Sequence, residues 1–238
     1  MQHSALTHIG LVRTENQDRH AVFQPDPAHL LLVLSDGMGG EAGGALAAET
    51  VINTLDKTAI GPITDPNPEE TLAQLTVEAG ERILEKARAD QKLEGLGATA
   101  VAVLLGPGRA HWVNLGDSRL YHLGKGGLRQ VSTDHSFIQE LLDAGDLTRE
   151  EARRHPMRHV LDQCAGTPGA EPDTGGFDLA PGDVVLLCSD GLHGYVTDEQ
   201  IADILGDKTD LDGMARSLVD AALSAGGRDN ITVVLARV

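Results

Sequence analysis

Apolar and polar residues follow one another along the chain in blocks that predict strands and helices. The unbroken apolar run Leu30–Leu34 stops at Ser35-Asp36-Gly37, and a second run, Val184–Cys188, stops at Ser189-Asp190-Gly191. Apolar runs of this length are typical of strands buried on both faces. Each run therefore brings a carboxylate to the end of a buried strand. Asp-Gly is also a strong hairpin signal, so for one run alone a tight turn explains the pattern equally well.

The first part of the chain predicts two short strands and two helices around the first apolar run. We expect the strands at 4–11 and 20–24, and a helix from Ala45, where apolar residues recur at helical spacing. The turn-rich segment 61–68 separates it from a second helix. That helix opens at Glu69-Glu70, because acidic side chains suit a helix N-terminus.

From Ala98 onward the pattern changes to short strands. Glycine-containing turns separate segments 98–105, 109–116, 118–124 and 127–131, which predicts an antiparallel meander. A polar stretch with short helical patterns at 137–142 and 148–154 follows, and such long excursions often carry function. We expect a helix over 197–205, where Thr197 and Gln200 form a capping box, and another over 211–225. A last strand follows at 231–238. Strands and helices are segregated, which favours an α+β domain over a parallel βαβ sheet.

Composition narrows the class of protein. The 238 residues can bury a real core, and we find no linker, so we expect one domain over 1–238. A formal net charge of −17 and an aromatic content of 3% argue against nucleic acid as a partner. We find no leader, no membrane-spanning stretch and only two cysteines, Cys164 and Cys188, which do not suggest a disulfide framework. A reducing cytoplasm is therefore the expected location.

Five aspartates stand next to expected strands. Asp18 precedes the strand 20–24, Asp36 and Asp190 end the buried runs, Asp117 lies between two strands, and Asp229 opens the last strand. A carboxylate beside an apolar run is costly unless it is paired or binds a metal. Singly, each is explained as an ordinary turn aspartate. Together, without histidine or cysteine at these corners, they predict an all-oxygen site that selects Mg²⁺ or Mn²⁺ over zinc.

Several carboxylates imply more than one ion. Two ions about 3.5–4 Å apart can share a bridging water or hydroxide and clamp both oxygens of an in-line displacement at phosphorus. No Ser-His pair is evident, and neither cysteine follows a phosphate-cradling loop. We therefore expect direct attack by metal-bound water. Arg13, five residues before Asp18, is the candidate for gripping the phosphate with its planar guanidinium.

The chain carries six short motifs: Arg13-Thr14-Glu15-Asn16-Gln17-Asp18, Asp36-Gly37-Met38-Gly39-Gly40, Gly97-Ala98-Thr99-Ala100, Gly116-Asp117-Ser118-Arg119, Ser189-Asp190-Gly191 and Gly227-Arg228-Asp229-Asn230-Ile231-Thr232. They resemble, in the same order, those of the metal-dependent protein phosphatases of the PP2C or PPM family in their short bacterial form. The resemblance implies two packed antiparallel β-sheets flanked by helices, an α-β-β-α sandwich, with a flap-like segment around 134–165. It also implies Mn²⁺- or Mg²⁺-dependent hydrolysis of phosphoserine and phosphothreonine in proteins.

Residue roles follow from matching these motifs. The resemblance implies that Asp36 bridges two tightly bound metals, that the Gly37 carbonyl binds one of them, and that Asp190 and Asp229 hold the other. Asp117 would serve a third, weaker ion, as in bacterial members of the family. Asp18 would be a supporting carboxylate and Arg13 the phosphate anchor. Met38 stands where animal members have a histidine proposed as general acid, so the acid is not identified.

Alternatives stay open at this stage. The Asp117 carboxylate could instead cap its turn or pair with Arg119. His193 is a candidate acid or a bystander. His135 is a hydrogen-bonded structural residue or lies near the site, and His155 and His159 are exposed loop residues or touch substrate. The expected partners are phosphorylated proteins, substrates of a serine/threonine kinase, and the expected state is a monomer that binds neither nucleic acid nor membrane. The alternative function is a non-catalytic phosphoprotein-binding or signalling module on the same fold.

Overall fold

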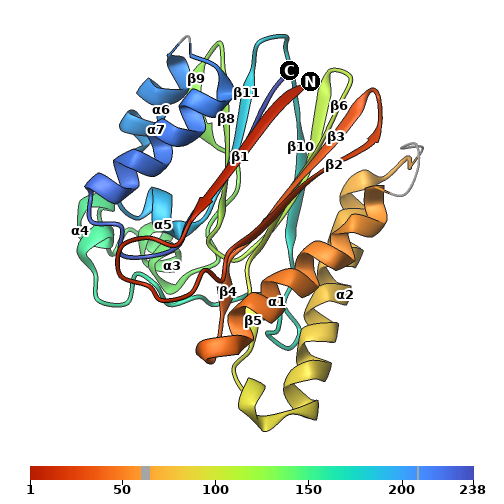
Figure 1. The fold of residues 1–238 in the computed structure, drawn as a ribbon, viewed down its shortest axis with the longest axis vertical. Coiled ribbons are helices and arrows are strands. Elements are labelled where there is room, and N and C mark those ends of the chain that lie inside the picture. The colour runs from red at the N-terminus through yellow and green to blue at the C-terminus, as the bar shows by residue number, and fades with distance from the viewer. Residues whose placement is uncertain (60–64, 208) are drawn as a thin grey trace.

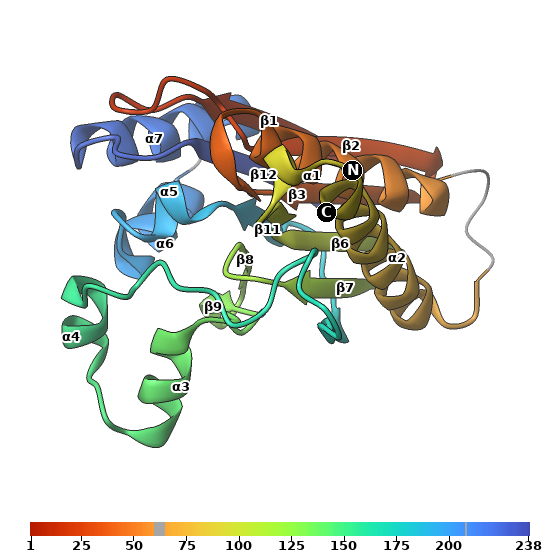
Figure 2. The same cartoon turned by 90° about the horizontal axis from the view of Figure 1, so that it is seen from below.

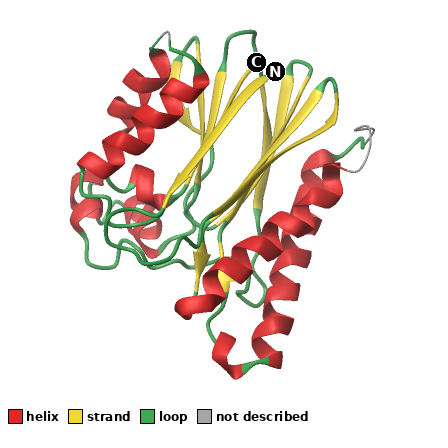
Figure 3. Ribbon diagram, in the orientation of Figure 1, coloured by secondary structure: helices red, strands yellow, loops and turns green. Residues whose placement is uncertain are grey.

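Two antiparallel five-stranded sheets pack face to face in the computed structural model, which describes residues 1–59, 65–207 and 209–238 (Figure 1). Helices cover the outer faces of both sheets, as Figure 3 shows by colour, so the fold is the expected α-β-β-α sandwich. The first sheet has the order β1 (Gln2–His8), β12 (Ile231–Arg237), β11 (Val184–Cys188), β8 (Arg119–Gly124), β9 (Gly127–Gln130). The second has the order β10 (Asp173–Asp178), β7 (Arg109–Leu115), β6 (Ala100–Gly106), β3 (His29–Ser35), β2 (Arg19–Asp26).

The unbroken apolar runs are strands buried on both faces, as predicted. In β3, Leu30, Leu32 and Leu34 face the other sheet, where they pack in a core that includes Val185 and Leu187 of β11. The alternate β3 residues pack under the helices of the second sheet. Because side chains in a strand point alternately to opposite faces, a strand between two apolar layers needs apolar residues at every position.

Each sheet has its own helical layer. On the second sheet, α1 (Gly40–Leu55) and α2 (Pro68–Ala89) share a buried cluster with β3 and β6. On the first, α6 (Asp198–Gly206), α7 (Leu211–Ser224) and the short α5 (Asp190–His193) pack against β11 and β12. The predicted capping box is present, because Thr197 accepts from the Gln200 backbone and the Gln200 side chain accepts from the Thr197 N–H. Among the described residues, no helix is long and apolar enough to cross a membrane.

The polar excursion after β9 carries two short helices, α3 (Phe137–Ala144) and α4 (Arg149–Arg154). Figure 2 shows them projecting from the sandwich on the side away from α1 and α2. Both begin at capping residues: Ser136 accepts from the Gln139 N–H, and Thr148 forms a capping box with Glu151. The remaining small elements are the two-stranded ribbon of β4 (Gly37–Met38) and β5 (Gly97–Ala98), and the 3₁₀ turns η1 (Asp56–Ala59) and η2 (Gln91–Leu93).

Several expectations were wrong in detail. The four segments after Ala98 do not form one meander, because the chain crosses from the second sheet to the first between β7 and β8. The edge strand β10 was not predicted, since its sequence DTGGFD has two glycines and one apolar residue, and it is recruited by pairing with β7. The first strand lies at 2–8 instead of 4–11, and α1 begins at Gly40. Part of the turn-rich segment 61–68 lies outside the described residues.

Candidate active site

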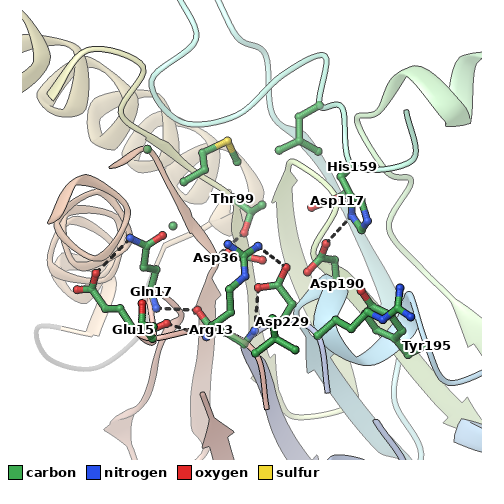
Figure 4. A pocket seen from close by; sticks show the side chains of 18 residues that line it. Arg13, Glu15, Gln17, Asp36, Thr99, Asp117, His159, Asp190, Tyr195 and Asp229 are labelled. Carbon is green, nitrogen blue, oxygen red and sulfur yellow. Dashed lines mark hydrogen bonds and ion pairs between the residues drawn. The ribbon is translucent and has the colours of Figure 1, made fainter. Parts of the chain in front are cut away.

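The five predicted aspartates come together at one end of the sandwich. Because neighbouring strands are antiparallel, the ends of β3, β7 and β11 meet the starts of β2 and β12 at the same edge. There a cleft of about 1220 Å³ opens, and its walls include four of the aspartates together with Arg13 and Gly37 (Figure 4). The four are Asp36, Asp117, Asp190 and Asp229, while Asp18 is almost fully buried.

Asp36 is held at the end of β3 by the neighbouring ribbon. Its backbone N–H donates to Thr99 Oγ1 at 2.8 Å, and the Thr99 N–H donates to the Asp36 carbonyl at 2.8 Å. The Ser118 hydroxyl lies 2.7 Å from Thr99 Oγ1 and extends this network toward Asp117. The next residue must be glycine, because a Cβ on Gly37 would lie 2.0 Å from a carbonyl oxygen of α1. The Ser-Asp-Gly step therefore leads from β3 through the short strand β4, which pairs with β5, to α1, and it is not a hairpin.

Asp18 links the two sheets. Its Oδ2 accepts hydrogen bonds from Ser189 Oγ at 2.8 Å and from Thr232 Oγ1 at 2.6 Å; Ser189 directly follows β11 and Thr232 lies in β12, both of the first sheet. Its Oδ1 is buried with no hydrogen-bond partner among the described residues. Burial raises the pKa of Asp18 from 3.8 to about 6, although the two hydroxyl hydrogen bonds act in the opposite direction. Its position suits the supporting role that the resemblance implies.

Asp190 begins α5 and contacts the excursion that carries α3 and α4. His159 Nδ1 lies 3.2 Å from Asp190 Oδ2, so a histidine considered only as exposed or substrate-touching reaches a predicted ligand. Burial acts to raise the pKa of Asp190, but the His159 hydrogen bond and nearby positive charge outweigh it and lower the pKa. Asp190 Oδ1 is buried without a hydrogen-bond partner in the described part of the chain.

Asp117 does not form the alternative ion pair with Arg119. The Arg119 guanidinium instead binds Asp134 in a bidentate manner, with Nε–Oδ1 and Nη2–Oδ2 distances of 2.9 and 2.7 Å. His193 Nε2 lies 2.9 Å from the Asp117 carbonyl oxygen and donates to it. Burial lowers the pKa of His193 to about 3, so this imidazole is neutral near neutral pH. Its geometry is that of a residue that positions Asp117.

The segment 9–17 brings Arg13 to the cleft. Asn230 holds this segment, because its Nδ2 donates to the Ile9 and Glu15 carbonyls at 2.9 Å and its Oδ1 accepts from the backbone of residue 17. Arg13 Nη2 lies 2.7 Å from Asp229 Oδ2. The predicted phosphate anchor is therefore paired with a predicted metal ligand in this structure.

Unneutralised negative charge dominates the site. The pKa of Asp36 lies well above its usual range, first because of burial and then because of the charges of Asp18, Asp190, Asp117 and Asp229. The pKa of Asp117 is also raised well above its usual range, mainly by burial and then by Asp190. The neighbouring carboxylates thus disfavour ionisation of Asp36 and Asp117. Cations would relieve this repulsion.

The donor set fits hard divalent cations. All five side chains offer oxygen, and two buried carboxylate oxygens, Asp18 Oδ1 and Asp190 Oδ1, have no hydrogen-bond partner among the described residues. Within that same part of the chain, no three acidic, histidine or cysteine side chains form a group that could hold one ion. Mg²⁺-type ions commonly take only one or two carboxylates each and keep several waters. A set of carboxylates shared between ions fits this chemistry.

Some residues that shape the site were not predicted to do so. Thr99 and Asn230 stand inside quoted motifs, but nothing in a linear sequence shows that their side chains hold Asp36 and the Arg13 segment. Ser189 and Thr232 likewise flank predicted aspartates, and only the packing of two sheets brings them to Asp18. His159 lies 31 positions before Asp190, so its contact depends on how the excursion folds back.

Comparison with known proteins gives consistent results. Residues 11–227 match the model of the protein phosphatase 2C family. The serine/threonine phosphatase Stp of Listeria welshimeri is 35% identical over 233 residues, which cover 96% of this chain and 92% of that protein. The crystal structure of the Mycobacterium tuberculosis serine/threonine phosphatase PstP/Ppp has a TM-score of 0.91 at 35% identity and covers 100% of this chain and 98% of its own. The PstP catalytic domain in complex with two manganese ions has a TM-score of 0.88 at 34% identity, covering 99% and 97%.

Proposed function

Because the chain belongs to the protein phosphatase 2C family, we propose that its five clustered aspartates form the centre in which it hydrolyses phosphoserine and phosphothreonine in proteins. The enzyme is a metal-dependent protein serine/threonine phosphatase. The observation that carries the residue assignment is that four of the five aspartates line one cleft together with Arg13. A non-catalytic module would be favoured by the loss of one or more of these side chains, and all are present.

The ions would be divided among the ligands as follows. Asp36 lies centrally and would bridge two ions, with the Gly37 carbonyl on one and Asp190 and Asp229 on the other. Asp117 would hold a third, weaker ion. The two manganese ions in the PstP complex support the number of tight sites. Asp117 and Asp190 line the same part of the cleft, which supports a shared ion between these two carboxylates.

When bound, Mn²⁺ or Mg²⁺ would lower the pKa of water and neutralise charge on the phosphoryl oxygens. Arg13 would exchange its bond with Asp229 for the phosphate, because an ion at Asp229 would compete with the guanidinium for the same oxygens. A planar guanidinium can then donate two parallel hydrogen bonds to the phosphate. Neither cysteine is in the cleft wall, and burial raises the pKa of both thiols, which supports a route without a cysteine–phosphate intermediate.

The biological setting is also part of the proposal. The substrates would be phosphoproteins made by a serine/threonine kinase, and the enzyme would act on them as a monomer in the cytoplasm. A formal net charge of −17 supports a protein substrate over a nucleic acid.

The test is hydrolysis of p-nitrophenyl phosphate and a phosphothreonine peptide across a Mn²⁺ titration. We expect excess EDTA to abolish activity, and Asp36→Asn or Asp190→Asn to remove tight Mn²⁺ binding and nearly all turnover. Asp220→Asn, an exposed carboxylate on α7, is the matched control and should behave as wild type. Full turnover in EDTA, or wild-type turnover of Asp36→Asn at saturating Mn²⁺, would refute the assignment.

A further inference from the structure

Two adjacent large apolar side chains are exposed in the segment that carries Arg13 to the cleft. Leu11 and Val12 are 66% and 65% exposed, more than any other large apolar side chain among the described residues. They directly precede Arg13, and Val12 lines the cleft with Arg13 and the aspartates. Single exposed apolar residues are common, whereas contiguous exposed apolar surface marks interaction sites.

The backbone that presents this pair is fastened on both sides. The Leu11 N–H donates to the Gly227 carbonyl at 2.6 Å, and Asn230 holds the carbonyls of Ile9 and Glu15. Gly10 has a φ of +85°, and a Cβ there would lie 2.2 Å from the Asp229 carbonyl oxygen. These contacts hold the segment against the loop that leads into β12. The exposure of Leu11 and Val12 is therefore a property of a fixed surface, so binding there costs little ordering entropy.

A cationic side chain lies on the adjoining loop. Arg228 is exposed, lines the same cleft and folds over Gly226, where a Cβ would lie 3.8 Å from Arg228 Nε. Leu11 Cγ would lie 2.9 Å from a Cβ on Gly227, so the two loops form one continuous surface. No ion pair of Arg228 is found within the described residues, in a chain whose net charge is −17. An unpaired cation on an acidic protein attracts a negatively charged group.

We propose that Leu11, Val12 and Arg228, called here the rim, bind the residues that flank the phosphoserine or phosphothreonine of the substrate. The rim selects substrates with an apolar residue and an acidic residue beside the phosphorylated one. This rests on the proposed function, since Arg13 must receive the phosphate. Extended chain spans about 3.3–3.6 Å per residue, so a residue one or two positions from a phosphate at Arg13 reaches the adjacent Val12.

The experiment compares phosphothreonine peptides that differ only beside the phosphothreonine. One peptide carries Leu and Asp there, a second carries Ser and Asp, and a third carries Leu and Lys. For each enzyme, the kcat/KM for each peptide is divided by the kcat/KM for p-nitrophenyl phosphate, which has no flanking residues. The variants are Leu11→Ser with Val12→Ser, and Arg228→Glu. The controls are Val77→Ser on α2, which is 41% exposed, and Arg216→Glu, exposed on α7.

We expect the double variant to reduce the preference for Leu over Ser by about tenfold, through KM, because burial of one or two apolar side chains is lost. Arg228→Glu should invert the preference between Asp and Lys, and both controls should keep the wild-type preferences. The proposal is overturned if the double variant keeps the Leu preference or if Arg228→Glu keeps the Asp preference. If wild type hydrolyses no p-nitrophenyl phosphate with Mn²⁺, the proposed function itself fails, which is a different result.

Discussion

Replacing Asp18 by Asn should change the pH dependence of stability in the metal-free protein. Asp18 is buried, its Oδ2 accepts two hydroxyl hydrogen bonds, and burial raises its pKa from 3.8 to about 6. Because the native state raises this pKa, ionised Asp18 destabilises the fold above about pH 6, and the destabilisation disappears as the pH falls toward 3.8. Asn keeps an acceptor for both hydroxyls but carries no charge at any pH.

The size of the effect follows from the two pKa values. A pKa difference between 3.8 and about 6 corresponds to about 3 kcal/mol, since one pKa unit equals about 1.4 kcal/mol. When the pH falls from 7.5 to 5.0, protonation of Asp18 in the native state raises the free energy of unfolding of the wild type by about 1.4 kcal/mol. Asp18→Asn has no charge at this position and gains none of it. The stability of the variant relative to wild type should therefore be about 1.4 kcal/mol greater at pH 7.5 than at pH 5.0. Any constant cost of the buried amide cancels in this difference.

Urea unfolding in EDTA at both pH values measures this difference. Asp220→Asn is the control, because its carboxylate is exposed on α7. Saturating Mn²⁺ should reduce the advantage of Asp18→Asn, since bound cations stabilise the ionised carboxylates of the native site. The same relative stability at pH 5.0 and pH 7.5 in EDTA would refute the account, as would a larger advantage at pH 5.0.

Variants at three further residues test individual roles in the site. Arg13→Ala should raise KM for phosphopeptide about tenfold without weakening Mn²⁺ binding, because it removes a hydrogen-bond donor to the phosphate and frees Asp229. Arg13→Lys should restore the wild-type KM only in part, because it lacks the planar guanidinium. Unchanged kinetics would make Arg13 a surface residue. His193→Ala should keep the alkaline limb of the pH–rate profile, because a His193 pKa of about 3 leaves this side chain without an acidic proton to donate near neutral pH. Loss of that limb would identify His193 as the general acid. Asp117→Ala should fold, keep two tight Mn²⁺ sites in calorimetry and lose most activity on phosphopeptide, whereas loss of a tight site would assign Asp117 to the central pair.

Much of the fold could be predicted because its signals are local. The apolar runs of β3 and β11 indicate strands buried on both faces, and the structure confirms this. The Thr197 capping box and the two short helices of the polar excursion are also confirmed, since caps and helical periodicity depend on residues a few positions apart. By contrast, β10 carries almost no pattern of its own, because an edge strand is formed by the partner that it pairs with.

The sequence by itself determined which side chains could act: aspartates at strand ends, an arginine shortly before the first of them, and no cysteine or histidine among the motif residues. Their common position at strand ends indicated an all-oxygen site, and the division of ions among them was implied only by resemblance. The tertiary structure decided what each contacts. It pairs Arg13 with Asp229 and Arg119 with Asp134, brings His159 to Asp190, and joins Asp18 to hydroxyls of the other sheet. These contacts join residues far apart in the chain, and their geometry depends on how two sheets pack and where their strands end together, which no local pattern contains.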